Sequence, residues 1–409
     1  MQPYDSPEEA SFRAEARAWL AAHAEPRTTE PIAPSAIIAE WSPDEEERKL
    51  AEARAWQATK YDAGWAGIAW PEEFGGRGGT LVEQLIFAQE EMRFDTPGDA
   101  LIIGLGWLGM ALMIHGSAEQ KERHLRSMLR GDEVWCQLFS EPAAGSDSAA
   151  MATSAVRDGD EWVITGQKVW TTFAHRSDWG LCVARHDPDL PKHRGLTAFV
   201  VDMRDPGVTC RPLRQMTDSA NFNEVFLDGV RVPDERRVDE IGAGWRVVTT
   251  TYMYERAGGG LTAPIPTGAL AELVAAAGRD GDPRIRDRFA DLHTRAEALR
   301  FTGLRIQTAL SHGRLPGTEG SILKLAWTDL LRDLYELALE VVGPAGMRVG
   351  DDAPGGGEWA AAFLGTPGLR IGGGTDEVQR NLIGERVLGL PKEPRVDVGV
   401  PFRTIPTSA

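Results

Sequence analysis

The segment from residue 137 to 147, which reads QLFSEPAAGSD, combines small residues and hydroxyl groups in a pattern that could bind an anion. A proline, two alanines and Gly145 let main-chain N–H groups turn towards a ligand, and Ser140 and Ser146 add two hydroxyl donors. A pyrophosphate or the edge of a flavin would suit such a cradle. The same composition is typical of an ordinary turn, so the segment alone leaves both interpretations open.

A second glycine-rich segment has the spelling of a dinucleotide site, because Gly104, Gly106 and Gly109 form a GxGxxG. That site requires a strand before the glycines, a helix after them and an acidic residue about twenty positions further on. Here the flanking residues have helical patterns on both sides, and the next strand-like stretch begins near Val134. We therefore interpret these glycines as small residues that allow helices to pack.

Composition and charge exclude several other kinds of site. The net charge of -17 disfavours binding to nucleic acid or to an anionic membrane surface. The longest apolar run, residues 101–114, contains three glycines and is too short to span a bilayer. The N-terminus has no secretory signal pattern, so we expect a cytoplasmic protein. Widely spaced Cys136, Cys182 and Cys210, together with scattered histidines, predict buried thiols and no metal site.

The elements that would position these residues fall into three groups. Helical periodicity predicts helices over residues 5–24, 42–63 and 81–94. From about Val134, short β-branched and aromatic runs separated by turns such as Asp158-Gly159-Asp160 and Asp228-Gly229 predict an antiparallel sheet or barrel. Long apolar stripes over residues 284–312 and 318–342 then predict a helical bundle.

This pattern predicts an α+β fold. The expected parts are an N-terminal helical domain at residues 1–133, a central β domain at 134–239, a helical bundle at 240–391 and a tail at 392–409. The proline-rich tail is expected to lie on a neighbouring subunit or to be loosely ordered.

Six segments in this order resemble the flavin-dependent acyl-CoA dehydrogenase family. They are AGWAGIAWPEEFGGRGGT, LRGDEVW, QLFSEPAAGSD, GQKVWTTF, FNEVFLDGVRVP and GGGTDEVQRNLIGERVLGLP. The resemblance covers nearly the whole chain as far as Pro391. It implies an N-terminal helical domain, a central β domain and a C-terminal four-helix bundle, with FAD between the β domain and the bundle of neighbouring subunits.

The resemblance also implies roles for single residues. Ser140 would hydrogen-bond the flavin edge, while Gly145 and Ser146 would lie beside the pyrophosphate and the CoA arm. Trp170 and Thr172 would cover and polarise the flavin, although a tryptophan on a strand is more often a core residue. The same resemblance assigns Phe139, Arg286, Gly343, Thr375 and Glu377 to the cofactor, and Ser146, Arg256 and Gly373 to the substrate.

The implied reaction oxidises an acyl-CoA thioester to the trans-2-enoyl-CoA. A base removes the proton next to the carbonyl, the flavin accepts the hydride from the next carbon, and an electron-transferring flavoprotein receives the electrons. The backbone N–H of the residue aligned with Gly373 would polarise the thioester oxygen. Many members carry the catalytic glutamate at that same position, where this chain has a glycine.

Relatives of the isovaleryl-CoA and long-chain type place the base on an earlier helix, before an arginine, and the corresponding pair here is Glu255-Arg256. Helical spacing puts Glu255 near the face of Tyr252 and Val248, so its carboxylate should be partly desolvated, as a general base requires. The alternative is a structural salt bridge with Arg256 or Arg286.

Two segments depart from the family pattern. The RxxFG segment that reaches the neighbouring FAD is not recognisable at residues 284–289, where Arg286 and Arg288 are the candidates to replace its arginine. Glu340 replaces the usual glutamine, and a carboxylate near a pyrophosphate is unfavourable unless it is paired. The adenine half of the site is therefore expected to be remodelled or completed by another chain, in a homotetramer or a heterotetramer.

These departures leave other functions open. One is a non-catalytic or partly catalytic subunit of a mixed oligomer, and another is oxidation of a nitroalkane or a carrier-protein thioester. If the chain is catalytic, Gly372 and Gly373 vacate space where relatives carry an aromatic residue and a glutamate, which favours a branched or bulky acyl group.

Overall fold

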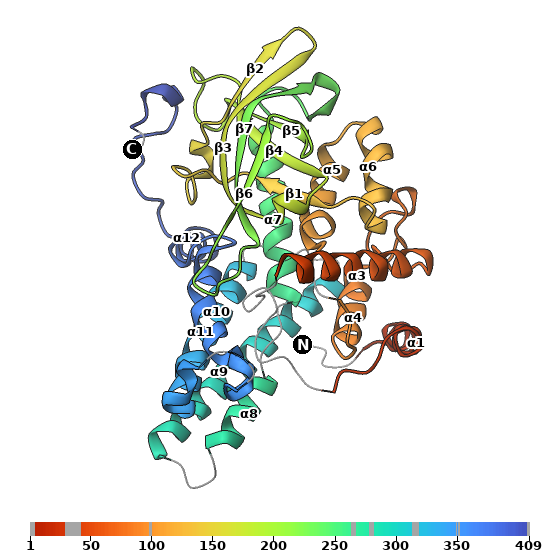
Figure 1. The fold of residues 1–409 in the computed structure, drawn as a ribbon, viewed down its shortest axis with the longest axis vertical. Coiled ribbons are helices and arrows are strands. Elements are labelled where there is room, and N and C mark those ends of the chain that lie inside the picture. The colour runs from red at the N-terminus through yellow and green to blue at the C-terminus, as the bar shows by residue number, and fades with distance from the viewer. Residues whose placement is uncertain are drawn as a thin grey trace.

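The computed structural model describes residues 5–28, 42–97, 100–262, 267–277, 282–312, 319–348, 350 and 352–406. Figure 1 shows three regions: N-terminal helices, a β domain beside them, and an elongated helical bundle that extends away from both. The predicted α+β arrangement is therefore confirmed. In the described part of the chain, no helix combines the length and apolar character needed to cross a bilayer.

The N-terminal helices begin at side-chain caps that the sequence encodes. Ser6 and Ser42 each accept a hydrogen bond from the backbone three residues later, where a glutamate bonds back to the cap, and a proline follows each serine. The three helices expected here are confirmed. The elements of this layer are α1 (Pro7–His23), α3 (Pro43–Asp62), α4 (Leu81–Glu91), the π-helical η2 (Ile103–Leu108), α5 (Gly109–His115) and α6 (Ala118–Arg130).

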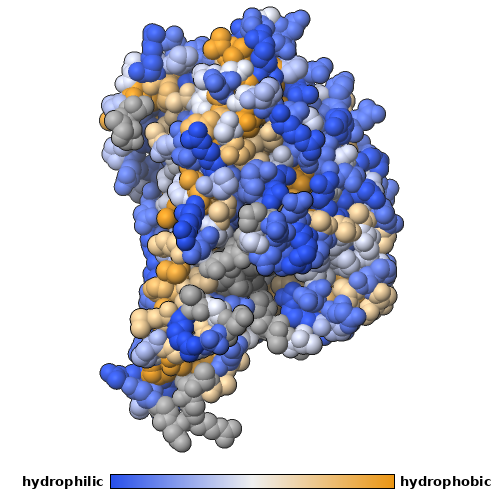
Figure 2. Space-filling model, viewed as in Figure 1, coloured by the Kyte–Doolittle hydropathy of each residue, from blue (hydrophilic) through white to orange (hydrophobic). Residues whose placement is uncertain are grey.

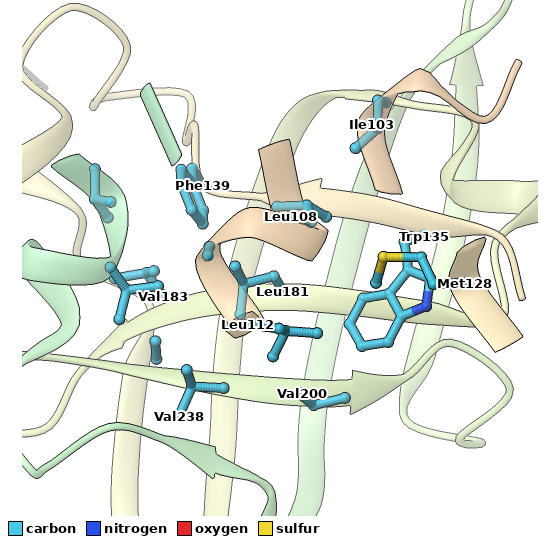
Figure 3. Close-up of a cluster of buried hydrophobic side chains, with 14 of the residues drawn as sticks. Ile103, Leu108, Leu112, Met128, Trp135, Phe139, Leu181, Val183, Val200 and Val238 are labelled. Carbon is cyan, nitrogen blue, oxygen red and sulfur yellow. The ribbon is translucent and has the colours of Figure 1, made fainter. Parts of the chain in front are cut away.

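A buried apolar cluster joins this layer to the sheet. Figure 3 shows Leu108, Leu112 and Leu181 in that cluster, and all three side chains are fully buried. Close packing leaves no room for a larger residue at Gly109, where a Cβ atom would lie 2.5 Å from the ring of Trp70. This contact supports the interpretation of the GxGxxG as a helix-packing segment.

The β domain is one eight-stranded mixed sheet with the order β6-β7-β3-β2-β4-β5-β8, in which β1 also pairs with β4. Strands β1 and β2 run parallel to β4, whereas the other pairs are antiparallel, so the prediction of an antiparallel sheet or barrel was only partly correct. The strands are β1 (Trp135–Leu138), β2 (Ser154–Asp158), β3 (Glu161–Thr172), β4 (Trp179–Arg185), β5 (Leu196–Asp202), β6 (Val208–Leu213), β7 (Phe222–Pro233) and β8 (Arg237–Val238).

Two strands are longer than predicted. From the sequence we expect separate short strands at residues 161–165 and 168–172, on either side of Gly166, but these residues form the single strand β3. Asp228-Gly229, expected to be a turn, lies inside β7. A register shift between Ile164 and Gly166 accommodates the glycine. A Cβ atom on Gly166 would lie 2.4 Å from Oγ1 of Thr153, so this glycine allows a neighbouring segment to approach closely.

The C-terminal bundle is built around α10, which contacts the helices on every side of it. Leu331, Tyr335 and Ala338 are fully buried in its core. Helix α11 was not predicted, because Pro367 and two glycines interrupt its pattern. The bundle consists of α7 (Gly244–Thr262), α8 (Thr267–Ala277), α9 (Pro283–Ser311), α10 (Glu319–Val342), α11 (Glu358–Ile371) and α12 (Asp376–Leu382).

The C-terminal tail lies against the β domain of its own chain. In Figure 1 the dark blue chain leaves α12 and runs along that domain to the C-terminal label. The backbone N–H groups of Phe402 and Arg403 donate to the carbonyls of Leu190 and Pro188, at 3.0 and 3.1 Å. The expectation of a loosely ordered tail was therefore wrong for residues 401–405, which are held on the β domain of the same chain.

Candidate functional site

Two segments of the β domain lie next to each other. The first is the loop that follows β1 and contains Ser140, and the second is the end of β3 with the residue after it, which reads WTTF. The N–H of Val169 donates to the carbonyl of Ser140 at 2.9 Å, which places Trp170 next to the first loop. The structure thus brings together the two segments that the sequence separates by about thirty residues.

A buried ion pair connects these loops. Nζ of Lys168, which is completely buried, donates to Oε1 of Glu141 at 2.8 Å and to the carbonyls of Phe139 and Val183 at 3.1 and 2.8 Å. The same carboxylate accepts hydrogen bonds from the backbone at residues 152 and 153. Burial opposes its ionisation, but Lys168 and these donors outweigh that effect and hold the pKa of Glu141 below its ordinary value.

The backbone at the end of β3 is strained. Trp170 and Phe173 have φ angles of 58° and 53°, a region that residues with a side chain seldom adopt. The pairing of β3 with β7 shifts register between Lys168 and Thr171, so Trp170 is 60% exposed although it lies on a strand. Such strain at an outward-facing indole is typical of a binding site, and it disfavours the interpretation of Trp170 as a core residue.

The first loop offers an open backbone. A Cβ atom on Gly145 would meet nothing within 4 Å, and Ser146 is exposed beside it. Oγ of Ser148 donates to the carbonyl of Gly145 at 3.0 Å and lies 2.7 Å from the hydroxyl of Tyr252. The loop is therefore held against helix α7, while its glycine and serine remain accessible to a ligand.

These features fit the flavin half of an FAD site. Trp170 presents an aromatic face, the partly buried Ser140 and Thr172 supply hydroxyl groups, and Gly145 leaves backbone open for a pyrophosphate. Phe139 is instead fully buried, with its ring edge-on to Tyr252, so it supports the loop from behind. No group of three or more His, Cys, Asp or Glu side chains among the described residues could hold a metal ion.

Glu255 of α7 lies beside the glycine turn that follows α11. A Cβ atom on Gly373 would be 3.6 Å from Oε1 of Glu255, so the carboxylate occupies the space next to this glycine. Glu255 is partly buried one turn after Tyr252, on the face that the helical spacing predicted. The side chain of Arg256 lies outside the described part of the structure.

The glycine turn is fixed by polar contacts. Gly373 and Gly374 have φ angles of 65° and 93°, and Nε2 of Gln379 donates to the carbonyl of Gly373 at 2.8 Å. Nζ of Lys324 donates to the carbonyl of Gly374 at 2.8 Å, and burial lowers the pKa of this lysine. Oδ2 of Asp376 accepts a 2.5 Å hydrogen bond from Arg370. These contacts hold the main chain of the turn in one conformation beside Glu255.

The other residues assigned to the cofactor belong to the bundle. Arg286 and Glu377 are exposed, and Thr375 caps α12 by accepting a hydrogen bond from the N–H of Val378. Gly343 has a φ of 65° and open space around it. The contacts of these four residues do not indicate a cofactor site. Their assignment to FAD therefore stays a prediction.

Glu340, which replaces the family's glutamine, is paired with Arg288. This ion pair removes the objection to an isolated carboxylate near a pyrophosphate. It also engages Arg288, one of the two candidate replacements for the arginine of the missing RxxFG segment. Arg288 and Glu340 therefore neutralise each other on this part of the bundle.

The backbone conformation of Gly373 predicts the effect of replacing it with alanine. Gly373→Ala should destabilise the protein by about 1 kcal/mol, because a Cβ is unfavourable at positive φ. The added methyl group would also contact the carboxylate of Glu255. We expect a slightly lower unfolding midpoint and reduced turnover. Gly159→Ala, which replaces a glycine of similar φ in an open hairpin turn far from Glu255, should reproduce the loss of stability alone.

Comparison with protein families matches three consecutive regions. Residues 6–132, 136–230 and 242–388 match the N-terminal, middle and C-terminal domains of acyl-CoA dehydrogenase, respectively. Acyl-CoA dehydrogenase IpdE1 of Mycobacterium tuberculosis is 38% identical over 392 residues, which cover 93% of this chain and 98% of the relative.

Solved structures share the same fold. The Tcur3481-Tcur3483 steroid ACAD matches with a TM-score of 0.78 at 28% identity, covering 96% of this chain and 100% of that one. The ChsE4-ChsE5 complex from Mycobacterium tuberculosis matches with a TM-score of 0.77, also at 28% identity and over the same shares of the two chains.

Proposed function

The chain belongs to the acyl-CoA dehydrogenase family, and from this premise we propose that it is a catalytic subunit that oxidises an acyl-CoA to the trans-2-enoyl-CoA with FAD. The observation that carries this proposal is the position of Glu255 against Gly373. A carboxylate from α7 lies beside the position where many relatives carry their catalytic glutamate. The chain thus keeps a base near that position after losing the usual one.

Each part of the proposed site has a defined task. The backbone N–H of Gly373 polarises the thioester carbonyl, which makes the adjacent proton more acidic. Glu255 accepts that proton from the α-carbon. FAD, when bound, supplies the acceptor for the hydride of the β-carbon, and an electron-transferring flavoprotein then receives the electrons. Ser140, Trp170 and Thr172 would hold its flavin, and Gly145 and Ser146 its pyrophosphate and the CoA arm.

The glycine turn favours a bulky acyl group. A Cβ atom on Gly372 would meet only one atom within 4 Å, so this side of the turn leaves space that an aromatic residue would fill. A relative of the same fold is described as a steroid ACAD, which is consistent with a large fused-ring substrate. The acyl group of this chain's substrate is therefore proposed to be branched or polycyclic.

A substrate panel tests this specificity. We expect kcat/KM for a CoA thioester with a polycyclic or branched acyl group to exceed that for butyryl-CoA by about tenfold or more, since a buried apolar ring system adds several kcal/mol of binding. The measurement is reduction of an artificial electron acceptor at equal enzyme concentration. Turnover of short straight-chain substrates alone would contradict the proposal.

A mixed oligomer is the second candidate, and exposed apolar residues on the bundle would suit a subunit interface. Figure 2 shows apolar residues interspersed among hydrophilic ones on one face of the molecule, and the end of the bundle exposes Ile371, Leu388 and Leu390. A homologous structure is described as a complex of two proteins, ChsE4 and ChsE5.

Measuring the FAD content of the chain purified alone distinguishes a homotetramer from a heterotetramer. Full FAD occupancy in a homotetramer would support a self-sufficient enzyme. Flavin content below one per chain, restored only by a second protein, would support a heterotetramer in which the partner completes the adenine half.

A further inference from the structure

The C-terminal tail, residues 392–406, binds the loop between β4 and β5 and through it reaches the candidate site. Pro401 forms an isolated β-bridge with Pro191, and the side chain of Arg403 pairs with Asp189 at 2.7 Å. The tail therefore docks onto residues 186–195 by backbone and side-chain contacts together.

The first link from this tail to the site runs through Arg185. Its buried guanidinium donates to the carbonyls of Ala149 and Met151, at 2.8 and 2.9 Å, and to that of Lys192 at 3.1 Å. The ring of Phe402 covers the guanidinium, 3.5 Å from its central carbon. Burial lowers the pKa of Arg185 to about 10, so it remains charged at neutral pH. Phe402 thus shields from water the cation that holds Ala149 and Met151, just after QLFSEPAAGSD.

The second link runs through Lys192. This lysine is 2% exposed, and its Nζ lies 2.6 Å from Oδ2 of Asp147 and also pairs with Asp397 of the tail. Arg395 pairs with Asp397 at 3.1 Å, so the cluster contains two cations and two carboxylates. Asp147 directly follows Ser146, and its charge would otherwise be free to face an anionic ligand at that serine.

We infer that the tail and Lys192 form a clamp that positions residues 145–151 for ligand binding. Lys192 is a positioning residue: it holds and neutralises Asp147, and the tail holds Lys192 through Asp397 and shields Arg185 through Phe402. The ligand at this loop is a diphosphate-bearing nucleotide, which rests on the proposed function, because FAD and CoA both present that group to Gly145 and Ser146. The clamp acts on binding and leaves the proton-transfer groups untouched.

Hydrogen–deuterium exchange tests the clamp without relying on catalysis. Removal of residues 392–409 and the variant Lys192→Met should each accelerate amide exchange in residues 141–151 by about tenfold or more, because the loop loses side-chain anchors. Exchange in α1, which lies in the N-terminal layer, serves as the internal reference and should stay unchanged. Lys192→Arg, which retains the charge, should restore much of the protection.

Kinetics then distinguish positioning from general damage. In both variants KM for the acyl-CoA should rise about tenfold while kcat stays within about twofold. Arg403→Gln is the matched control: it removes only an exposed ion pair of the same tail and leaves the backbone hydrogen bonds of Phe402 and Arg403 in place, so both quantities should match the wild type. If the truncated chain exchanges rapidly everywhere, Lys192→Met decides.

Unchanged exchange of residues 141–151 in Lys192→Met would overturn the clamp, whether or not the wild type oxidises an acyl-CoA. A wild type that shows the clamp by exchange but oxidises no acyl-CoA would instead contradict the proposed function alone.

Discussion

Glu255→Gln should lower kcat by about 10²- to 10⁴-fold or more while the protein remains yellow with bound flavin. The amide keeps the size and polarity of the side chain but cannot accept the substrate proton. Because Glu255 lies beside the glycine turn of the bundle, whereas Ser140 and Trp170, the residues proposed to hold the flavin, belong to the β domain, cofactor binding should be retained. Steady-state turnover and flavin absorbance measured on the same sample check both parts of this expectation.

Glu336→Gln provides the matched control for this variant. It makes the same chemical change at an exposed carboxylate of the bundle, on α10, and should leave kcat unchanged. Turnover of Glu255→Gln within threefold of the wild type would show that another group removes the proton, and Glu255 would then be a structural glutamate.

Lys168→Met should be the most destabilising of the substitutions considered for the β domain. It leaves the buried Glu141 carboxylate without its cation, and breaking a buried pair in this way costs about 3–5 kcal/mol. We expect a large fall in the urea midpoint of unfolding and loss of flavin, since the pair connects the two loops. Arg48→Met, which removes an exposed pair with Glu52, should cost roughly 0–1 kcal/mol.

A second substitution tests the physical cause. Glu141→Gln in the Lys168→Met background removes the stranded charge and should recover part of the stability. The pair also predicts a pH dependence. Since the pKa of Glu141 is lower in the folded chain than its ordinary 4.5, its stabilisation is complete above pH 4.5 and declines as the pH falls towards the lowered value. An equal urea midpoint for wild type and Lys168→Met at neutral pH would contradict the role of this pair.

Local patterns predicted most of the fold. Capping serines followed by proline and glutamate marked the starts of α1 and α3, and β-branched runs marked the strands. The strands were harder to divide, because Gly166 and Gly229 read as turn residues, whereas each accommodates an irregularity inside a long strand. The sequence carries no signal that separates these two uses of glycine.

The candidate site was predictable where the family supplied a motif and where helical spacing applied. Ser140 and Trp170 lie together as the resemblance implied, and Glu255 lies on the expected face of α7. The Lys168–Glu141 pair was missed, since a lysine on a strand usually points to solvent and only the contact with Glu141 explains its burial. The one available sign of this pair was that Lys168 belongs to GQKVWTTF, the family-like segment that comes directly after QLFSEPAAGSD.

Long-range contacts explain the remaining differences. The tail was misjudged because its partner, residues 186–195, is a loop whose polar and proline-rich composition gives no sign of a binding surface. Tyr252 was placed on the correct helical face, but its contact with Ser148 depends on how α7 packs against the β domain. Such contacts are set by tertiary structure and leave no local periodicity.

Anaerobic bleaching of the flavin tests the central claim most directly. The purified wild type, with its flavin and any partner subunit it requires, is mixed with a bulky acyl-CoA in the absence of oxygen and of an external acceptor. We predict rapid loss of the yellow absorbance in the wild type and none on the same timescale in Glu255→Gln. Equal bleaching in both proteins would contradict the assignment of Glu255 as the base.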